Sequence, residues 1–106
     1  MPIKLKPKQL SDASEKRAVL LYKGRQQIAS GALHHSKGDV LTERFLIEDK
    51  ITERRSFSVT EELLLKARKE AYQHRRTALF RVTVGKATYV TLHEEDFLAL
   101  LNQLPE

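Results

Sequence analysis

The chain has 106 residues, of which 41% are hydrophobic and 31% charged, and its formal net charge is +5. These values indicate one globular domain with a modest core and exclude a disordered chain. The lack of cysteine excludes disulfides, thiolate zinc sites and a cysteine nucleophile. A small basic domain favours an anionic partner, with nucleic acid ahead of an acidic membrane surface.

Residues 1–10 alternate lysine with proline, isoleucine and leucine, which predicts a basic N-terminal arm ahead of a single domain over residues 11–106. This segment lacks the apolar stretch of a secretory signal, and no apolar run approaches the roughly 20 residues that span a bilayer. We therefore expect a cytoplasmic protein with no membrane partner.

A helix is expected from about residue 12 to residue 23. Ser11 suits its N-cap, and Gly24 suits the C′ position, where the backbone is usually left-handed. The expected apolar face contains Ala18, Leu21 and Tyr22. A short strand over residues 25–29 and a loop rich in Ser, Gly and His follow.

The middle of the chain predicts two strands, residues 39–42 and 44–52, joined by a turn near Glu43 and Arg44. Residues 56–76 predict the longest helix, with Ser58 and Glu61 at capping-box spacing. The apolar stripe of this helix comprises Leu64, Ala67 and Ala71.

Residues 77–84 and 87–92 alternate with period two around Gly85-Lys86, which predicts a hairpin. A closing helix over residues 93–104 carries the apolar side chains Phe97, Leu100, Leu101 and Leu104. The element order is then α-β-β-β-α-β-β-α, so the predicted fold is a mixed α/β domain with about five strands flanked by helices. The closing helix either covers the sheet or contributes to a dimer.

Charged residues interrupt the apolar strand of residues 45–52. Period-two alternation places Leu46, Glu48, Lys50 and Thr52 on one face, and Phe45, Ile47, Asp49 and Ile51 on the other. Glu48 and Lys50 therefore point the same way, and Asp39 begins the neighbouring strand, within reach of the same edge.

Two carboxylates that converge repel each other unless a cation lies between them. Mg²⁺ is the natural cation, because it binds one or two carboxylates together with water and phosphate oxygens. A lysine beside it would hold a phosphate oxygen or orient the attacking water. Asp39, Glu48 and Lys50 thus suit phosphodiester hydrolysis. The alternative is that Glu48 and Lys50 form an ordinary solvated charge pair.

The segment "GDV", followed after a turn by a strand that ends in "IEDK", resembles the signature of the PD-(D/E)xK nuclease superfamily, with Asp39, Glu48 and Lys50 at the signature positions. A helix with Glu15-Lys16-Arg17, a strand and a Ser/Gly-containing loop precede it. This order resembles the archaeal-type Holliday-junction resolvases, which include small phage proteins. The resemblance implies that the protein acts in a prokaryotic cell, with a phage-infected cell as one option.

The resemblance implies a restriction-endonuclease-like core, a two-fold homodimer, Mg²⁺ with Mn²⁺ as a substitute, and branched double-stranded DNA, above all the four-way junction, as substrate. It also implies Glu15 as a further metal-binding acid and Ser30, with Ser36 as the alternative, as an assisting residue. Two features depart from the family pattern. Gly38 replaces proline, and Asp49 stands where an apolar residue is usual, which requires a bulge or an edge strand.

A basic surface is expected to contact DNA phosphates. The residues assigned to it are Lys16, Arg17, Arg25, Lys37, Arg54, Arg55, Lys66, Lys69 and Arg76. A basic run on a helix is also common as a purely solvated face. Thr52 either supports Lys50 through a hydrogen bond or is an ordinary β-branched strand residue. His34-His35 lacks ligand spacing, so zinc is not expected.

Two other functions remain open from the sequence. A nuclease of the same superfamily would share the chemistry and act on other branched or linear DNA, since loops and dimer arrangement select the substrate. A basic DNA-binding module without catalysis would use Glu48-Asp49-Lys50 only as a surface charge cluster.

Overall fold

The computed structural model describes residues 6–26 and 39–105, and at Asp39 it describes the backbone. The elements, in order, are α1 (Pro7–Tyr22), β1 (Arg25–Gln26), β2 (Asp39–Leu41), β3 (Phe45–Thr52), α2 (Glu61–Gln73), β4 (Thr77–Val84), β5 (Ala87–Thr91) and α3 (Glu94–Leu101). The predicted mixed α/β fold, with its order α-β-β-β-α-β-β-α, is confirmed.

The five strands form one sheet in the order β1-β2-β3-β4-β5. Strands β3 and β4 are parallel over their whole length, and the other neighbours are antiparallel. Parallel neighbours need a long crossover, which α2 provides, whereas the tight turn at Gly85 suffices for β4 and β5.

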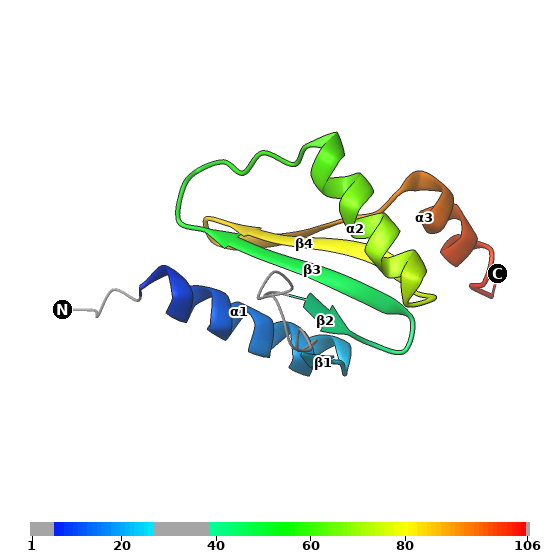
Figure 1. Ribbon diagram of the computed structural model, residues 1–106, viewed down its shortest axis with the longest axis horizontal. Coiled ribbons are helices and arrows are strands. Elements are labelled where there is room, and N and C mark those ends of the chain that lie inside the picture. The colour runs from blue at the N-terminus through cyan, green and yellow to red at the C-terminus, as the bar shows by residue number, and fades with distance from the viewer. Residues whose placement is uncertain (1–5, 27–38, 106) are drawn as a thin grey trace.

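Helices cover both faces of the sheet, with α1 on one side and α2 on the other (Figure 1). On the α1 side, Val40, Ile47 and Leu79 pack with Ala18. On the α2 side, Phe80 and Val82 pack with Ala67, and a neighbouring cluster joins Leu41 and Leu46 to Ala71. The predicted two-faced alternation of β3 is therefore confirmed.

Helix α1 begins earlier than predicted. Its first residue is Pro7 and its N-cap is Lys6, so residues 7–10 are helical and do not belong to an extended arm. Proline suits the first helical position because its missing N–H would have no partner there. The backbone N–H of Lys6 donates to Gln9 Oε1 at 2.9 Å. Ser11 lies inside the helix and is not its N-cap.

The end of α1 also differs from the prediction, because the left-handed residue is Lys23 (φ 55°) and not Gly24. Gly24 is needed for another reason. A Cβ there would lie 2.7 Å from Val40 Cγ1 and 2.8 Å from the carbonyl oxygen of Leu41, so glycine lets the chain pass close to β2. Leu21, which was expected in the core, is exposed.

Helix α2 is shorter than predicted at both ends. Thr60, and not Ser58, is its N-cap, and the Thr60 hydroxyl accepts a hydrogen bond from the Leu63 N–H at 3.2 Å. The helix ends at Gln73, before Arg75, whose φ of 56° is left-handed. Leu64, Ala67 and Ala71 do face the sheet, and the small alanines allow close packing.

Candidate functional site

Glu48 and Lys50 lie on the α2 side of β3, as the alternation predicted. The Lys50 Nζ is 3.1 Å from Glu48 Oε1, and the side chains are 37% and 22% exposed respectively. The parallel register places Glu48 beside Phe80, which packs against α2. The pair is thus half-buried at the border of the core.

Asp39 is brought to this pair by the antiparallel register of β2 and β3. It is the direct cross-strand partner of Glu48, just as Val40 is the partner of Ile47. Directly opposite residues of an antiparallel pair lie on the same face of the sheet. The backbone therefore confirms the predicted juxtaposition of Asp39 with Glu48.

Glu15 lies on the other side of the sheet. Its neighbour Ala18 packs on Val40 and Ile47, which belong to the α1 face, and Glu15 itself is 8% exposed. Glu48 and Lys50 belong to the α2 face. The structure therefore does not bring Glu15 to the pair that the sequence analysis joined with it.

Asp49, the unusual middle residue of the "EDK" segment, is buried on the α1 face and is ion-paired. Its Oδ1 lies 2.6 Å from Arg81 Nη1, and the two side chains are 1% and 2% exposed. Arg81 Nη1 also donates to the carbonyl oxygen of Ser14 at 3.2 Å and to its hydroxyl at 3.3 Å. Strand β3 pairs residue for residue with β4, so neither a bulge nor an edge position explains Asp49.

Arg81 was not among the predicted site residues, although the sequence contains a signal for it. Residues 77–84 alternate as a strand with apolar side chains, and an arginine at a buried position of such a strand needs an oppositely charged partner. Asp49 is predicted to face the core as well and needs a partner for the same reason. In the structure the two residues are register partners on adjacent strands. The network ties α1 to the point of β3 that lies between Glu48 and Lys50.

The predicted metal site rests on oxygen donors of the kind that Mg²⁺ prefers, since one or two carboxylates with water satisfy this ion. Glu48 provides one carboxylate, and the register brings Asp39 opposite it. Among the side chains that the structure describes, those of residues 6–26 and 40–105, no three from His, Cys, Asp or Glu gather as a metal-binding group. In the structure, the Lys50 ammonium group forms an ion pair with the Glu48 carboxylate and so neutralises its charge.

Most of the predicted phosphate contacts are exposed: Lys16, Arg17, Arg25, Arg54, Arg55, Lys66 and Lys69. Arg76 is different, because its guanidinium donates to the main-chain oxygens of Thr42 at 2.9 Å and of His74 at 3.0 Å. Arg76 thus holds the end of α2 against the turn between β2 and β3.

The remaining predicted residues either form a local hydrogen bond or lie outside the residues that the structure describes. Thr52 is the last residue of β3, and its hydroxyl accepts a hydrogen bond from the Arg54 N–H at 3.0 Å. This side chain therefore stabilises the turn that follows the strand. Ser30, Lys37, Ser36 and His34-His35 lie outside the described residues.

Comparison with known proteins found no match among family models, curated proteins or solved structures. In the described part of the chain, no helix has the length and apolar character required to cross a membrane.

Proposed function

We propose that the protein is a metal-dependent, structure-specific DNA endonuclease that resolves four-way junctions, of the Holliday-junction resolvase type. The observation that carries this proposal is the register of β2 and β3, which sets Asp39 directly opposite Glu48, with Lys50 Nζ 3.1 Å from the Glu48 carboxylate. An acid, a second acid and a lysine are thereby gathered at one place on a sheet.

In this proposal Asp39 and Glu48 hold Mg²⁺, or Mn²⁺ in its place. When bound, the ion supplies a positive charge that polarises a phosphoryl oxygen. Lys50 holds a non-bridging phosphate oxygen or orients the attacking water. The water oxygen forms a bond to phosphorus, the bond to the leaving sugar oxygen breaks, and the water gives up one proton as the leaving oxygen takes up another.

Glu15 is not a ligand in this proposal, because it lies on the α1 side of the sheet. The metal site therefore depends on two carboxylates, a number that suffices for Mg²⁺ when water and substrate oxygens complete the shell. The buried Asp49–Arg81 pair has a supporting role, since it fixes β3 between Glu48 and Lys50.

The charge of the domain supports a DNA substrate. The chain carries 19 basic against 14 acidic residues, and exposed basic side chains lie on α1, on α2 and after β3. Such side chains neutralise phosphates and release counterions, which makes binding strong at low salt and independent of base sequence. Shape and not sequence would then select the substrate.

A symmetric homodimer belongs to the proposal, because a four-way junction offers two equivalent strands to cut and a two-fold dimer presents two equivalent sites. Helix α3 buries no residue in the single chain, and Phe97, Leu98 and Leu101 are all more than 40% exposed. This apolar surface suits a subunit contact. Sedimentation at micromolar concentration should give a dimer for the wild type and a monomer for Leu101→Glu.

Cleavage of labelled DNA tests the proposed activity. Purified protein is incubated with a synthetic four-way junction, a flap and a linear duplex of the same sequence, with Mg²⁺ or with EDTA. Paired symmetric cuts in the junction alone, only with Mg²⁺, are expected. Equal cutting of all three substrates would replace the resolvase by a nuclease of broader substrate range. Salt-sensitive binding without cleavage under any divalent metal would favour a DNA-binding module.

A further inference from the structure

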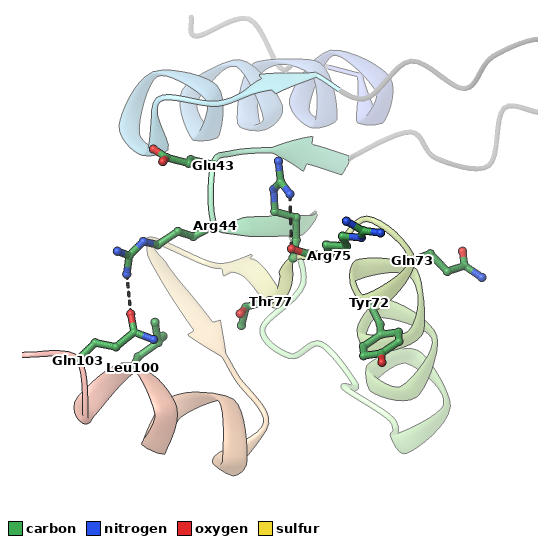
Figure 2. A pocket seen from close by; sticks show the side chains of 9 residues that line it. Glu43, Arg44, Tyr72, Gln73, Arg75, Thr77, Leu100 and Gln103 are labelled. Carbon is green, nitrogen blue, oxygen red and sulfur yellow. Dashed lines mark hydrogen bonds between the residues drawn. The ribbon is translucent and has the colours of Figure 1, made fainter.

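A pocket of about 770 Å³, lined mostly by charged and polar residues, lies at one end of the sheet, and neither Glu48 nor Lys50 lines it. Three parts of the chain form it: the turn between β2 and β3, the end of α2 with the first residue of β4, and α3 (Figure 2). The residues that line it are Glu43, Arg44, Tyr72, Gln73, Arg75, Arg76, Thr77, Leu100 and Gln103.

The pocket is positively charged, because three arginines face one glutamate, Glu43. Arg76 is engaged by main-chain oxygens, and Arg44 Nη1 donates to Gln103 Oε1 at 2.8 Å. Arg75 differs from both, since its guanidinium has no ion pair or hydrogen bond with any described residue. An incoming anion would therefore meet at least one guanidinium whose donors are all free.

Arg75 also occupies a backbone position that disfavours arginine. The Arg76 N–H donates to the Ala71 oxygen at 2.8 Å and the Arg75 N–H to the Tyr72 oxygen at 2.9 Å, which is the Schellman pattern that ends a helix. The C′ residue of this pattern is left-handed and usually glycine, and here it is Arg75 with φ 56°. A side chain kept where glycine would be less strained points to a use for that side chain.

Tyr72 adds an aromatic surface beside this charge. Its side chain is 83% exposed, although large aromatic rings are normally buried. Gln103 lines the opposite side of the pocket, where its Oε1 accepts a hydrogen bond from Arg44. An exposed ring next to free arginine is the combination that binds unpaired nucleotides, with the base stacked on the ring and the phosphate on the guanidinium.

We propose that this pocket binds a nucleotide unit of single-stranded nucleic acid. Tyr72 stacks on the base and Arg75 holds the phosphate, while Arg44 and Gln103, hydrogen-bonded to each other at 2.8 Å, bound the opposite side of the pocket (Figure 2). The volume suits a whole nucleotide and exceeds the need of a lone phosphate ion.

This inference goes beyond the proposed nuclease activity and uses none of its residues. Arg44 precedes Glu48 by four residues, which on an extended strand is roughly 13 Å. Loss of one site therefore leaves the other intact, and the two proposals fail separately. A chain without nuclease activity would still bind unpaired nucleotides, and an active nuclease whose pocket binds none would contradict this inference alone.

The stacking role is tested by fluorescence anisotropy with a labelled oligothymidylate and with an abasic strand of equal length. Tyr72→Leu should weaken binding of the oligothymidylate about tenfold and leave the abasic strand unchanged, because stacking on one base is worth that much. Tyr89→Leu is the matched control, since Tyr89 is exposed on β5 outside the pocket. Equal effects of the two substitutions, or equal loss on both strands, would overturn the stacking role.

The phosphate role is tested with Arg75→Gly, which removes the charge and also relieves the left-handed strain. The variant should melt at a higher temperature than the wild type but bind both strands several-fold more weakly, with a salt dependence reduced by about one ion. Lys86→Gln, at the exposed turn after β4, is the charge-matched control and should change binding less. Unchanged binding by Arg75→Gly would overturn the proposal.

Competition experiments, in which unlabelled ligands displace the labelled strand, show whether the pocket recognises a mononucleotide, a polymeric strand or phosphate alone. Displacement of the labelled strand by thymidine monophosphate, with inorganic phosphate ineffective at the same concentration, is expected for a site that recognises base and phosphate together. Displacement by an unlabelled strand alone would assign the site to polymeric nucleic acid. Equal displacement by inorganic phosphate would reduce the pocket to a simple anion site and overturn the assignment to nucleotides.

Discussion

Asp49 on β3 and Arg81 on β4 form an ion pair inside the core, with 2.6 Å between Asp49 Oδ1 and Arg81 Nη1. Each residue is the register partner of the other, and Arg81 reaches Ser14 of α1 through the same nitrogen. Two strands and a helix are thus held together directly behind Glu48 and Lys50.

Removal of one partner should be strongly destabilising. In Asp49→Asn the arginine keeps its charge in the core without a counter-ion, so we expect a loss of about 3–5 kcal/mol in the free energy of unfolding. Urea denaturation measures this loss. The double variant Asp49→Leu/Arg81→Met, which removes both charges, should recover much of the stability, and a double variant that unfolds more easily than Asp49→Asn would contradict this explanation.

Gly24→Ala tests the close approach of the chain to β2. The added Cβ would meet Val40 Cγ1 at 2.7 Å and the Leu41 oxygen at 2.8 Å, and the latter is backbone that cannot rotate away. We expect a loss of about 1–3 kcal/mol, as for other overpacked sites. At Gly85 a Cβ has no neighbour within 4 Å, and only the left-handed φ of 64° opposes it. Gly85→Asn, which tolerates that φ, should therefore cost less than Gly24→Ala.

The N-cap of α2 is tested by a pair of alanine substitutions. Thr60→Ala removes the acceptor of the Leu63 N–H and should cost about 1 kcal/mol in thermal or urea unfolding. Ser58→Ala should lie within about 0.5 kcal/mol of the wild type, since Ser58 is an exposed residue outside the helix. A larger loss for Ser58→Ala would show that the helix begins where the capping-box spacing predicted.

Arg68 connects α2 to α3 through two hydrogen bonds to Asp96, from Nε at 3.3 Å and from Nη2 at 3.2 Å. The hydrogen bond to Asp96 raises the pKa of Arg68, so the arginine stays charged at every pH that the fold tolerates. Asp96→Asn should speed amide exchange in α3 by about two- to fivefold at low salt.

Glu95→Gln is the matched control for Asp96→Asn, because Glu95 lies 3.6 Å from Arg68 and is far more exposed. It should change exchange in α3 less than Asp96→Asn does. High salt should reduce the difference between wild type and Asp96→Asn, since both charges are partly solvated. A difference independent of salt would mean that packing, and not the ion pair, holds α3.

The order of elements could be predicted because strands and helices here have distinct periods. The alternation in residues 45–52 also predicted correctly which side chains share a face with Glu48. The side of the sheet that Glu15 faces could not be predicted, because it depends on how α1 rotates about its axis, and the expected stripe wrongly included the exposed Leu21. Local capping rules likewise placed the left-handed residue at Gly24, but in the structure this residue is Lys23. Glycine is needed at position 24 because the chain passes close to β2 there.

Contacts between distant segments account for the other differences. Asp49 and Arg81 are 32 residues apart and meet only through the parallel register of β3 and β4. The pocket that Arg75 lines is formed by the β2–β3 turn, the end of α2 and α3. These parts are far apart in the sequence, so no local motif predicts the pocket. Both features contain charged residues whose partners cannot be predicted from the alternation of apolar and polar residues.

The most direct measurement compares junction binding and junction cleavage by the wild type, Glu48→Gln and Glu62→Gln in Mg²⁺. Glu62 is an exposed acid on α2 and controls for the lost charge. We expect Glu48→Gln to bind the junction as the wild type does but to cut it at least a hundredfold more slowly, while Glu62→Gln cuts normally. Cleavage by Glu48→Gln at the wild-type rate would contradict the assignment of Glu48 and Lys50 to a catalytic site.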